Sequence, residues 1–199
     1  MLSSTETINY KQLVETINKA IFGDSSRETT REDTGVNTIN EEKTTSSIDN
    51  SVKSSEQFIR ENYQKRYLQL VYQDSFYPEE SNNSIQFIGQ LKGIYGNTVL
   101  ANWFISMYNE NVGDPVILKG LLYTILYYSD CFGDLVELSA QAALSHSSKE
   151  INELGVRILE SQCNEKHYNI LCNIKGRENW LQNYIEEVKK DFKKELCLY

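Results

Sequence analysis

The chain has 199 residues, of which 28 are Asp or Glu and 20 are Lys or Arg, and its formal charge at pH 7 is −8. This excess of acid argues against general binding to DNA, RNA or anionic lipid, because each of these surfaces attracts clustered basic residues. The length suffices for one domain of ordinary size and a tail.

The compartment is predicted from features that the sequence lacks. No apolar run approaches the roughly 18 residues that a membrane-spanning helix requires, and residues 1–12 lack the basic start and apolar stretch of a signal peptide. We therefore expect a cytoplasmic protein without membrane contact. Disulfides are typical of secreted chains, so we expect four free thiols, at Cys131, Cys163, Cys172 and Cys197.

The N-terminal part divides into an amphipathic segment and a polar one. Residues 1–22 are predicted to form a short amphipathic helix with Tyr10, Leu13, Val14, Ile17 and Ile21 on one side. This helix either docks on the rest of the chain, binds a partner or a second copy, or frays, so homo-oligomerisation through it stays open. Residues 23–55 are dominated by Ser, Thr, Asp, Glu and Asn, which predicts a disordered polar linker and hence a flexible N-terminal arm.

Residues 56–199 are predicted to form a helical domain. Its first helix covers residues 56–73 and is broken by the polar stretch around Pro78. A second helix follows, and Gly96-Asn97 predicts a turn and an N-cap before a third helix at 98–109. The apolar stripes of these helices include Ile59, Tyr67, Val71, Ile85, Ile88, Leu91, Trp103, Phe104 and Met107.

The stretch from Asp114 to Ser161 has the clearest pattern, because two helix starts lie in it 33 residues apart. Asp114-Pro115 provides an N-cap and a proline at the first helical position, and Ser147 with Glu150 has the spacing of a capping box. After each start the apolar residues match at the same offset. Leu118, Leu121, Leu122, Ile125 and Leu126 correspond to Ile151, Leu154, Gly155, Ile158 and Leu159.

Each start also leads to a second short helix, in which Leu135 and Leu138 correspond to Tyr168 and Leu171. Asn164 is expected to cap the second of these, and Gly176 to stop it as a C′ glycine. The helix predicted at 178–196 has one apolar stripe and reads as the opening half of a third unit, which makes it a natural cap. Repeated helix pairs of this length are typical of an α-solenoid.

The run from Asp114 to Ile174 resembles HEAT-type helical repeats, in which antiparallel helix pairs stack side by side with Asp or Pro near the start of the first helix. The body from about 84 to 196 also resembles short bacterial HEAT-like proteins without established activity. This resemblance implies an all-α, HEAT-like α-solenoid, a right-handed stack of about eight helices, and a role as a scaffold for macromolecular contact. It implies that partners bind on the surface lined by the second helices.

We therefore expect a protein–protein interaction module and not an enzyme. Size and acidity suggest a bacterial immunity, antitoxin or defence-associated protein that binds a basic partner. The first alternative is a nucleic-acid-processing enzyme of the HEAT-like DNA glycosylase type. That branch uses a basic groove, and no Lys- or Arg-rich helix face stands out before the last helix. The second alternative is a structural subunit of a larger complex.

The candidate contact residues come from two features. Glu137, Gln141 and Glu165 lie on the predicted second helices, on the surface where the resemblance implies binding. Tyr123 and Tyr127 lie one turn apart, beside Tyr128, and are either packed inside a central helix or anchors of an aromatic contact patch.

Neither a metal nor a cofactor is expected. Cys163, His167 and Cys172 form the one Cys/His cluster, but their spacing matches no common zinc motif and a fourth ligand is lacking. Buried or half-buried thiols are the simpler interpretation. His146 lies in a predicted turn, where a capping or surface role is expected rather than catalysis, so no catalytic residue is assigned.

Overall fold

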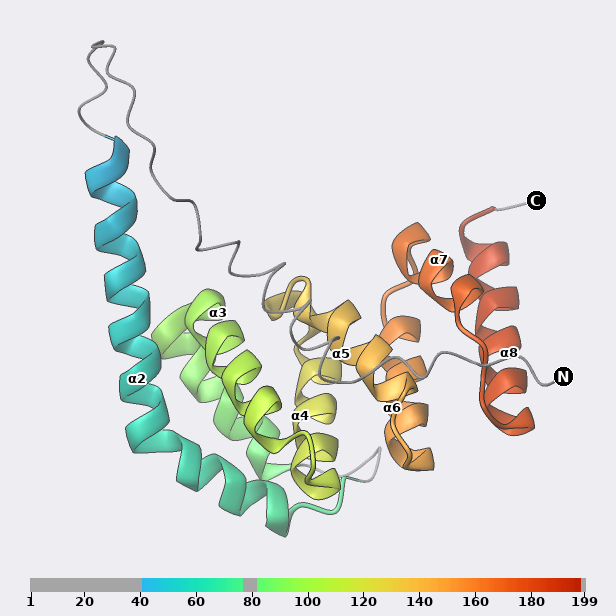
Figure 1. Ribbon diagram of the computed structural model, residues 1–199, viewed down its shortest axis with the longest axis horizontal. Coiled ribbons are helices and arrows are strands. Elements are labelled where there is room, and N and C mark those ends of the chain that lie inside the picture. Colours follow the sequence, from blue (N-terminus) through green and yellow to red (C-terminus); the bar gives the residue numbers. More distant parts are fainter. Residues whose placement is uncertain (1–40, 77–81, 198–199) are drawn as a thin grey trace, which may run out of the picture. The chain divides into compact units, whose positions relative to one another are not determined.

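The computed structural model of the chain describes residues 41–76 and 82–197, which Figure 1 shows as coloured ribbon. The chain divides into two units, Met1–Asn50 and Ser51–Tyr199. Of the first unit only residues 41–50 are described, and the second unit holds all the other described residues.

Every regular element among the described residues is a helix, which confirms the predicted all-α class. The elements are α2 (Glu41–Gln73), α3 (Asn83–Asn111), α4 (Pro115–Tyr127), the 3-10 helix η1 (Ser129–Cys131), α5 (Leu135–Leu144), α6 (Lys149–Glu160), α7 (Glu165–Asn173) and α8 (Asn179–Glu195). Within these ranges no helix has a stretch long and apolar enough to cross a bilayer.

Helix α2 begins earlier than the sequence predicts. The linker was expected to extend to residue 55, but residues 41–55 belong to α2, which corrects that boundary. Extending an existing helix adds one backbone hydrogen bond per residue without a new nucleation cost, and this stretch contains neither Pro nor Gly. The predicted helix at 1–22 and the linker residues 23–40 lie outside the described residues.

The prediction of a turn at Gly96 is confirmed. Its φ of 78° and ψ of 172° are non-helical and divide α3 into two helices. Glycine adopts a positive φ at little steric cost because it lacks a Cβ. The bend lets both halves of α3 bury their apolar stripes, with Ile88 and Leu91 before it and Trp103 and Phe104 after it.

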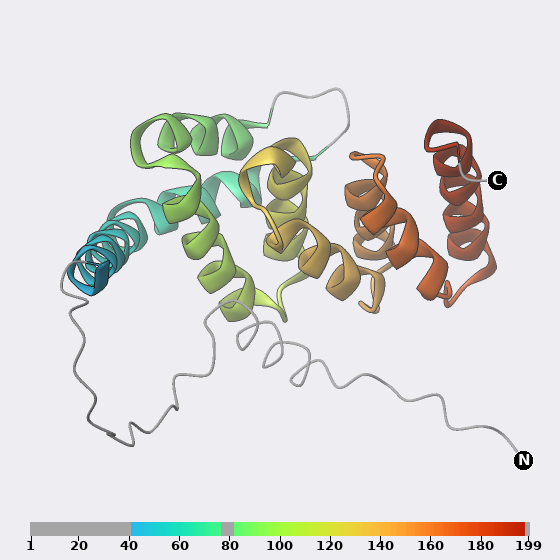
Figure 2. The ribbon, with the colours of Figure 1, turned by 90° about the horizontal axis from the view of Figure 1, so that it is seen from above.

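The core of the second unit is built on the matched stripes of α4 and α6. The apolar residues predicted from the 33-residue offset are at most 3% exposed at Leu118, Leu121, Leu122, Ile125, Ile151, Leu154, Ile158 and Leu159. Helix α6 packs against α4, α5, α7 and α8, and α4, α6 and α8 follow one another in both views of this unit (Figures 1 and 2). Leu126, which belongs to the same predicted set, is half-buried. The stripes therefore bury most of the faces that the sequence assigns to the interior.

Two of the predicted helix starts have the expected caps. The Asp114 carboxylate accepts the backbone N–H groups of Val116 and Ile117 at 3.0 and 3.2 Å. The Asn164 side chain accepts the N–H of His167 at 2.8 Å. Each cap satisfies a backbone donor that lacks a partner within the helix.

The predicted capping box at Ser147 is wrong, because α6 begins one residue later than predicted. The N-cap of α6 is Ser148, whose side chain makes no capping bond, while its N–H donates to Nδ1 of His146 at 3.0 Å. The buried Asn152 amide makes a different contact, donating to the carbonyls of Ala143 and His146 at 2.9 and 2.8 Å. The end of α5 is thereby satisfied from within α6.

Gly176 does not end α7 as a C′ glycine. The helix already ends at Asn173, and Ile174 follows in an extended conformation. A Cβ at Gly176 would lie 2.5 Å from the backbone nitrogen of Gln182. The glycine therefore permits the close approach of this turn to the start of α8.

Candidate functional site

The three neighbouring tyrosines of α4 occupy different environments. Tyr123 is half-buried, and its ring stacks on Phe76 with centroids 5.2 Å apart. Tyr128 packs towards α3, where its hydroxyl donates to the carbonyl of Ile85 at 3.3 Å. Tyr127 is 68% exposed. Tyr123 and Tyr128 are thus partly packed inside the domain, whereas Tyr127 is exposed.

Tyr123 lines a groove between α4 and α6. The groove consists of two adjoining cavities of about 190 and 370 Å³, which share Phe76, Lys119 and Glu150 in their walls. The end of α2 and the residues after it contribute Asp74 and Phe76 to the walls. We call this feature the α4–α6 groove.

The apolar part of the groove is built around Phe76. Its side chain is 4% exposed and its φ is 53°, a backbone conformation that is rare for a bulky residue. Such strain is often found where a side chain is held for function. Tyr123 and Leu154 line the same cavity as Phe76, and Val116, 44% exposed, lines the adjoining one.

The charged part of the groove contains two ion pairs. Lys119 Nζ lies 3.2 Å from Glu150 Oε2 and thereby joins α4 to α6. Arg157 lies 2.8 Å from Glu153 one turn earlier on α6. These four side chains have no net charge, and Asp74 adds one acid to the walls. The groove therefore offers donors and acceptors beside apolar surface, with no excess of basic side chains.

The other three predicted contact residues lie elsewhere, at α5 and α7. Glu137 Oε1 is 3.0 Å from Lys166 Nζ and 3.4 Å from His167 Nε2, and Gln141 donates to the backbone carbonyl of Glu137 at 3.4 Å. Glu165 is exposed in the first turn of α7. The structure therefore brings Glu137 and Gln141 together but separates them from Tyr123.

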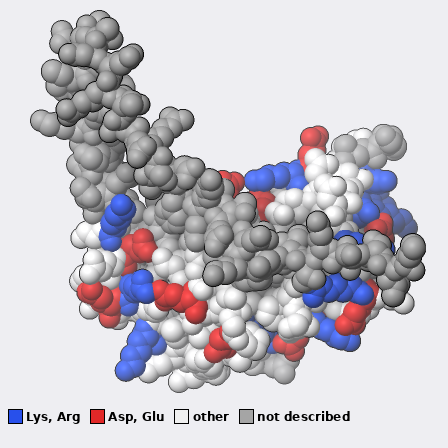
Figure 3. Space-filling model, in the orientation of Figure 1, with Lys and Arg blue, Asp and Glu red and all other residues white. Residues whose placement is uncertain are grey.

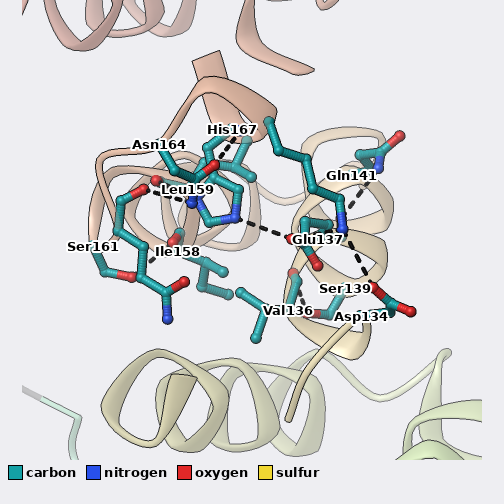
Figure 4. A network of polar contacts seen from close by, with 12 residues as sticks. Asp134, Val136, Glu137, Ser139, Gln141, Ile158, Leu159, Ser161, Asn164 and His167 are labelled. Atoms are coloured by element: carbon teal, nitrogen blue, oxygen red, sulfur yellow. Dashed lines mark hydrogen bonds and ion pairs between the residues drawn. The ribbon is translucent and has the colours of Figure 1, made fainter. Parts of the chain in front are cut away.

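Figure 4 shows the polar network around His167. From the sequence, His167 was assessed only as a possible zinc ligand. The ring is fully buried, and its Nδ1 lies 2.9 Å from the carbonyl oxygen of Leu159. Lys166 also contacts Asp134 at 3.2 Å, and the hydrogen bond to Glu137 is the main cause that raises the pKa of Lys166. The one sequence signal for this burial is that His167 lies four residues before Leu171, on the same face of α7.

The cysteines are separated from one another as well. Cys131 is buried, Cys163 is half-buried, and Cys172 and Cys197 are exposed, all as free thiols. In residues 41–76 and 82–197, no group of three or more His, Cys, Asp or Glu side chains is placed to hold a metal ion.

Large apolar side chains are exposed on α2, α3 and α4. They are Phe58, Tyr72, Ile94, Val116 and Tyr127, each at least 44% exposed. Phe58 also belongs to a cluster of rings whose centroids lie 6.1–6.4 Å apart, with Tyr63, Phe87 and Tyr95. Tyrosine and phenylalanine are enriched at protein interfaces, which the sequence indicated for the tyrosines of α4 but not for this cluster.

The acidic charge is spread over both units. Residues 51–199 contain 19 Asp and Glu against 15 Lys and Arg, a formal charge of −4, so half of the total of −8 lies in residues 1–50. On the part of the face in Figure 3 that is not grey, acidic and basic side chains are interspersed. The second unit is therefore less acidic than the whole-chain charge suggests.

Comparison of the chain with protein-family models, curated proteins and solved structures finds no match. The function proposed below therefore rests on the groove, the exposed apolar side chains and the charges described above.

Proposed function

We propose that this chain is a HEAT-like helical-repeat module that binds another protein through the α4–α6 groove, which lies between first helices and not on the second-helix surface that the resemblance implies. In this arrangement α4 with α5 and α6 with α7 are two helix pairs, and α8 opens a third. The contacts support the proposal, because first helices touch in the order α4, α6, α8, and α5 and α7 each pack against the first helix that follows. Stacked repeats contact their neighbours in this way.

The observation that carries the binding role is the Phe76–Tyr123 stack in a groove with a charged edge. Binding hot spots combine aromatic residues in a desolvated pocket with a surrounding polar rim. A partner's apolar side chain would contact Val116 and the half-buried ring of Tyr123, which the buried Phe76 supports from below, while its polar groups would meet Lys119 and Glu150. The smaller cavity, about 190 Å³, matches a single side chain rather than a large cofactor.

The charges of the second unit bear on the kind of partner. Binding of a basic partner, as proposed from the net charge, would be accelerated by a formal charge of −4 on this unit. The affinity would come mainly from apolar contact, because the ion pairs in the groove cancel. An immunity, antitoxin or defence role is a narrower proposal supported by size and net charge alone.

The binding role is favoured over an enzyme of the glycosylase type by the composition of the groove. Such an enzyme needs a basic channel, because nucleic-acid affinity comes largely from phosphate contacts. The α4–α6 groove instead holds three acids, Asp74, Glu150 and Glu153, for its two bases, Lys119 and Arg157. A role as a structural subunit held by the N-terminal helix concerns residues outside the described ranges.

The test is site-specific photo-crosslinking in the native host. A photoreactive phenylalanine analogue at Val116 should capture a partner, whereas the same analogue at Glu187, exposed on α8, should not. Val116→Arg should abolish co-purification of that partner, and Glu187→Arg should leave it unchanged. Equal capture from both positions, or a partner that tolerates Val116→Arg, would refute binding through the groove.

A further inference from the structure

His167 is a buried titratable residue that joins three helices and is separate from the α4–α6 groove. It belongs to α7, its Nδ1 faces the carbonyl oxygen of Leu159 on α6, and its Nε2 faces Glu137 on α5 (Figure 4). The ring is fully buried and the Glu137 side chain is 14% exposed. Water can therefore replace few of the contacts that these groups make with each other.

The hydrogen-bonding capacities of the three groups do not balance with a single ring proton. A carbonyl only accepts, so the 2.9 Å contact with Leu159 requires a proton on Nδ1. An ionised carboxylate also only accepts, so a neutral ring would direct the lone pair of Nε2 at Glu137. Within the described residues, neither Nε2 of His167 nor Oε2 of Glu137 has a hydrogen-bond partner. One additional proton on the pair removes this conflict.

The surrounding charges favour placing that proton on the ring. From α7, Lys166 Nζ lies 3.0 Å from Glu137 and forms an ion pair with it. Asp134, just before α5, forms a second ion pair with Lys166, with 3.2 Å between Oδ1 and Nζ. Glu165 is exposed in the first turn of α7.

The charged groups of α8 face other parts of α7. Lys189 pairs with Glu186 at 2.9 Å and interacts electrostatically with Cys172 and Tyr168. Glu195 acts on Cys163, which precedes α7. The ring is therefore governed by Glu137 and Lys166, with the uncharged carbonyl of Leu159 on its other side.

Helix α7 depends strongly on this contact. It has nine residues, and His167 and Leu171 are its buried ones. A short helix with few buried side chains belongs to the least stable part of a domain, where local opening is easiest. Loss of the contact at His167 should therefore increase local opening in α7 more than in α4 or α6.

We propose that His167 and Glu137 form a proton-dependent lock that fastens α7 to α5. With a proton taken up from solvent, the ring donates to Leu159 from Nδ1 and to Glu137 from Nε2. When that proton is released, Nε2 becomes an acceptor facing an acceptor, and the contact with Glu137 is lost. The lock is closed at lower pH and opens as the pH rises.

The test is hydrogen exchange of the α7 backbone amides in the full chain across about pH 5 to 8, the range in which histidine usually titrates. Protection factors are corrected for the intrinsic pH dependence of exchange, and ring ¹⁵N shifts report the protonation of His167 in the same samples. As the ring loses its proton, α7 protection should fall roughly two- to tenfold, as for one lost hydrogen bond. Protection in α6 should change less.

Glu137→Gln is the informative variant, because its amide can donate to a neutral Nε2. Its α7 protection should no longer depend on pH, whereas the control Glu165→Gln should keep the wild-type response. The lock is refuted by a ring that titrates without any change in α7, by a ring that stays in one state across the range, or by a response that survives Glu137→Gln. If that variant does not fold, the wild-type series alone decides.

Discussion

Gly155 lies where α6 comes close to α5, so a single methyl group tests their packing. A Cβ there would lie 2.8 Å from the carbonyl oxygen of Ala140 and 2.9 Å from Cγ of Leu144. Gly155→Ala should therefore cost about 1–3 kcal/mol of unfolding free energy through overpacking, measured by urea denaturation.

Gly93 provides the matched control for that substitution. It lies in α3, and a Cβ there would have no described neighbour within 4 Å. Gly93→Ala should stabilise the protein by about 0.4–1 kcal/mol, because alanine restricts the unfolded chain and favours the helix. A gain from both substitutions would mean that α5 and α6 pack less tightly than described.

Asp114 makes helix α4 sensitive to acid. The hydroxyl of Tyr72 donates to its carboxylate at 2.6 Å, and this bond is the main cause that lowers the pKa of Asp114, with further lowering by the N–H groups of Ile117 and Val116. Because the folded pKa lies below the unfolded value of about 3.9, the stabilisation is complete above that value. It is lost as the pH falls through the folded pKa.

Two substitutions separate the cap of α4 from its charge. Asp114→Ala should cost about 0.5–2 kcal/mol at pH 7, as for other lost N-caps. Asp114→Asn should retain most of the cap at pH 7. When the pH falls below about 4, this variant should lose less unfolding free energy than the wild type does. Urea unfolding across a pH series provides the measurement. Identical acid dependence in wild type and Asp114→Asn would show that this carboxylate does not contribute.

At the scale of elements, α4 and α6 should contribute equally to stability. Leu121 and Leu154 hold matching positions in the 33-residue register and are 0% and 3% exposed. Leu121→Ala and Leu154→Ala should each cost about 2–5 kcal/mol in a denaturation experiment. The control Ile94→Ala, at a side chain that is 69% exposed, should change stability by less than about 0.5 kcal/mol.

A small loss of stability on substitution of either leucine would show that the two positions are not equivalent in α4 and α6. It would also weaken the proposal of a repeat, since α4 and α6 are its two first helices. Large losses at both positions would support packing but not the handedness of the stack, which depends on how successive pairs rotate.

At the scale of the whole molecule, residues 51–199 hold a core of their own. The matched stripes of α4 and α6 and the aromatic contacts of Tyr67 with Trp103 and Phe104 all lie within them. A fragment beginning at Ser51 should therefore unfold cooperatively, with a Tm within about 4 °C of the full chain, corresponding to about 1 kcal/mol. Calorimetry of both proteins gives the comparison.

A second fragment, beginning at Lys65, serves as the control. It removes the fully buried Ile59 and the ion pair between Arg60 and Glu110. It should be clearly less stable than the fragment that begins at Ser51. Equal stability of the two fragments would place the boundary of the folded unit later than residue 51.

Much of the helical architecture was predictable because its causes are local. The caps at Asp114 and Asn164 and the bend at Gly96 each depend on a few neighbouring residues. The start of α6 was misplaced by one residue because Glu150 lies three residues after Ser147 and so favours Ser147, whereas Ser148 is the N-cap. The buried amide of Asn152 satisfies carbonyl groups at the end of α5, a contact between two helices that the spacing of residues does not predict.

The candidate sites depend on contacts between distant parts of the chain. Phe76, Tyr123 and Arg157 line one cavity although they lie on three different segments, and hydrophobic spacing shows which face is buried but not which residues meet. His167 likewise reads as an ordinary helical residue until the packing of α5 and α6 places an acceptor at each ring nitrogen. Periodicity therefore predicts the helices and their buried faces, whereas the groove and the proton-dependent pair arise from how those faces pack.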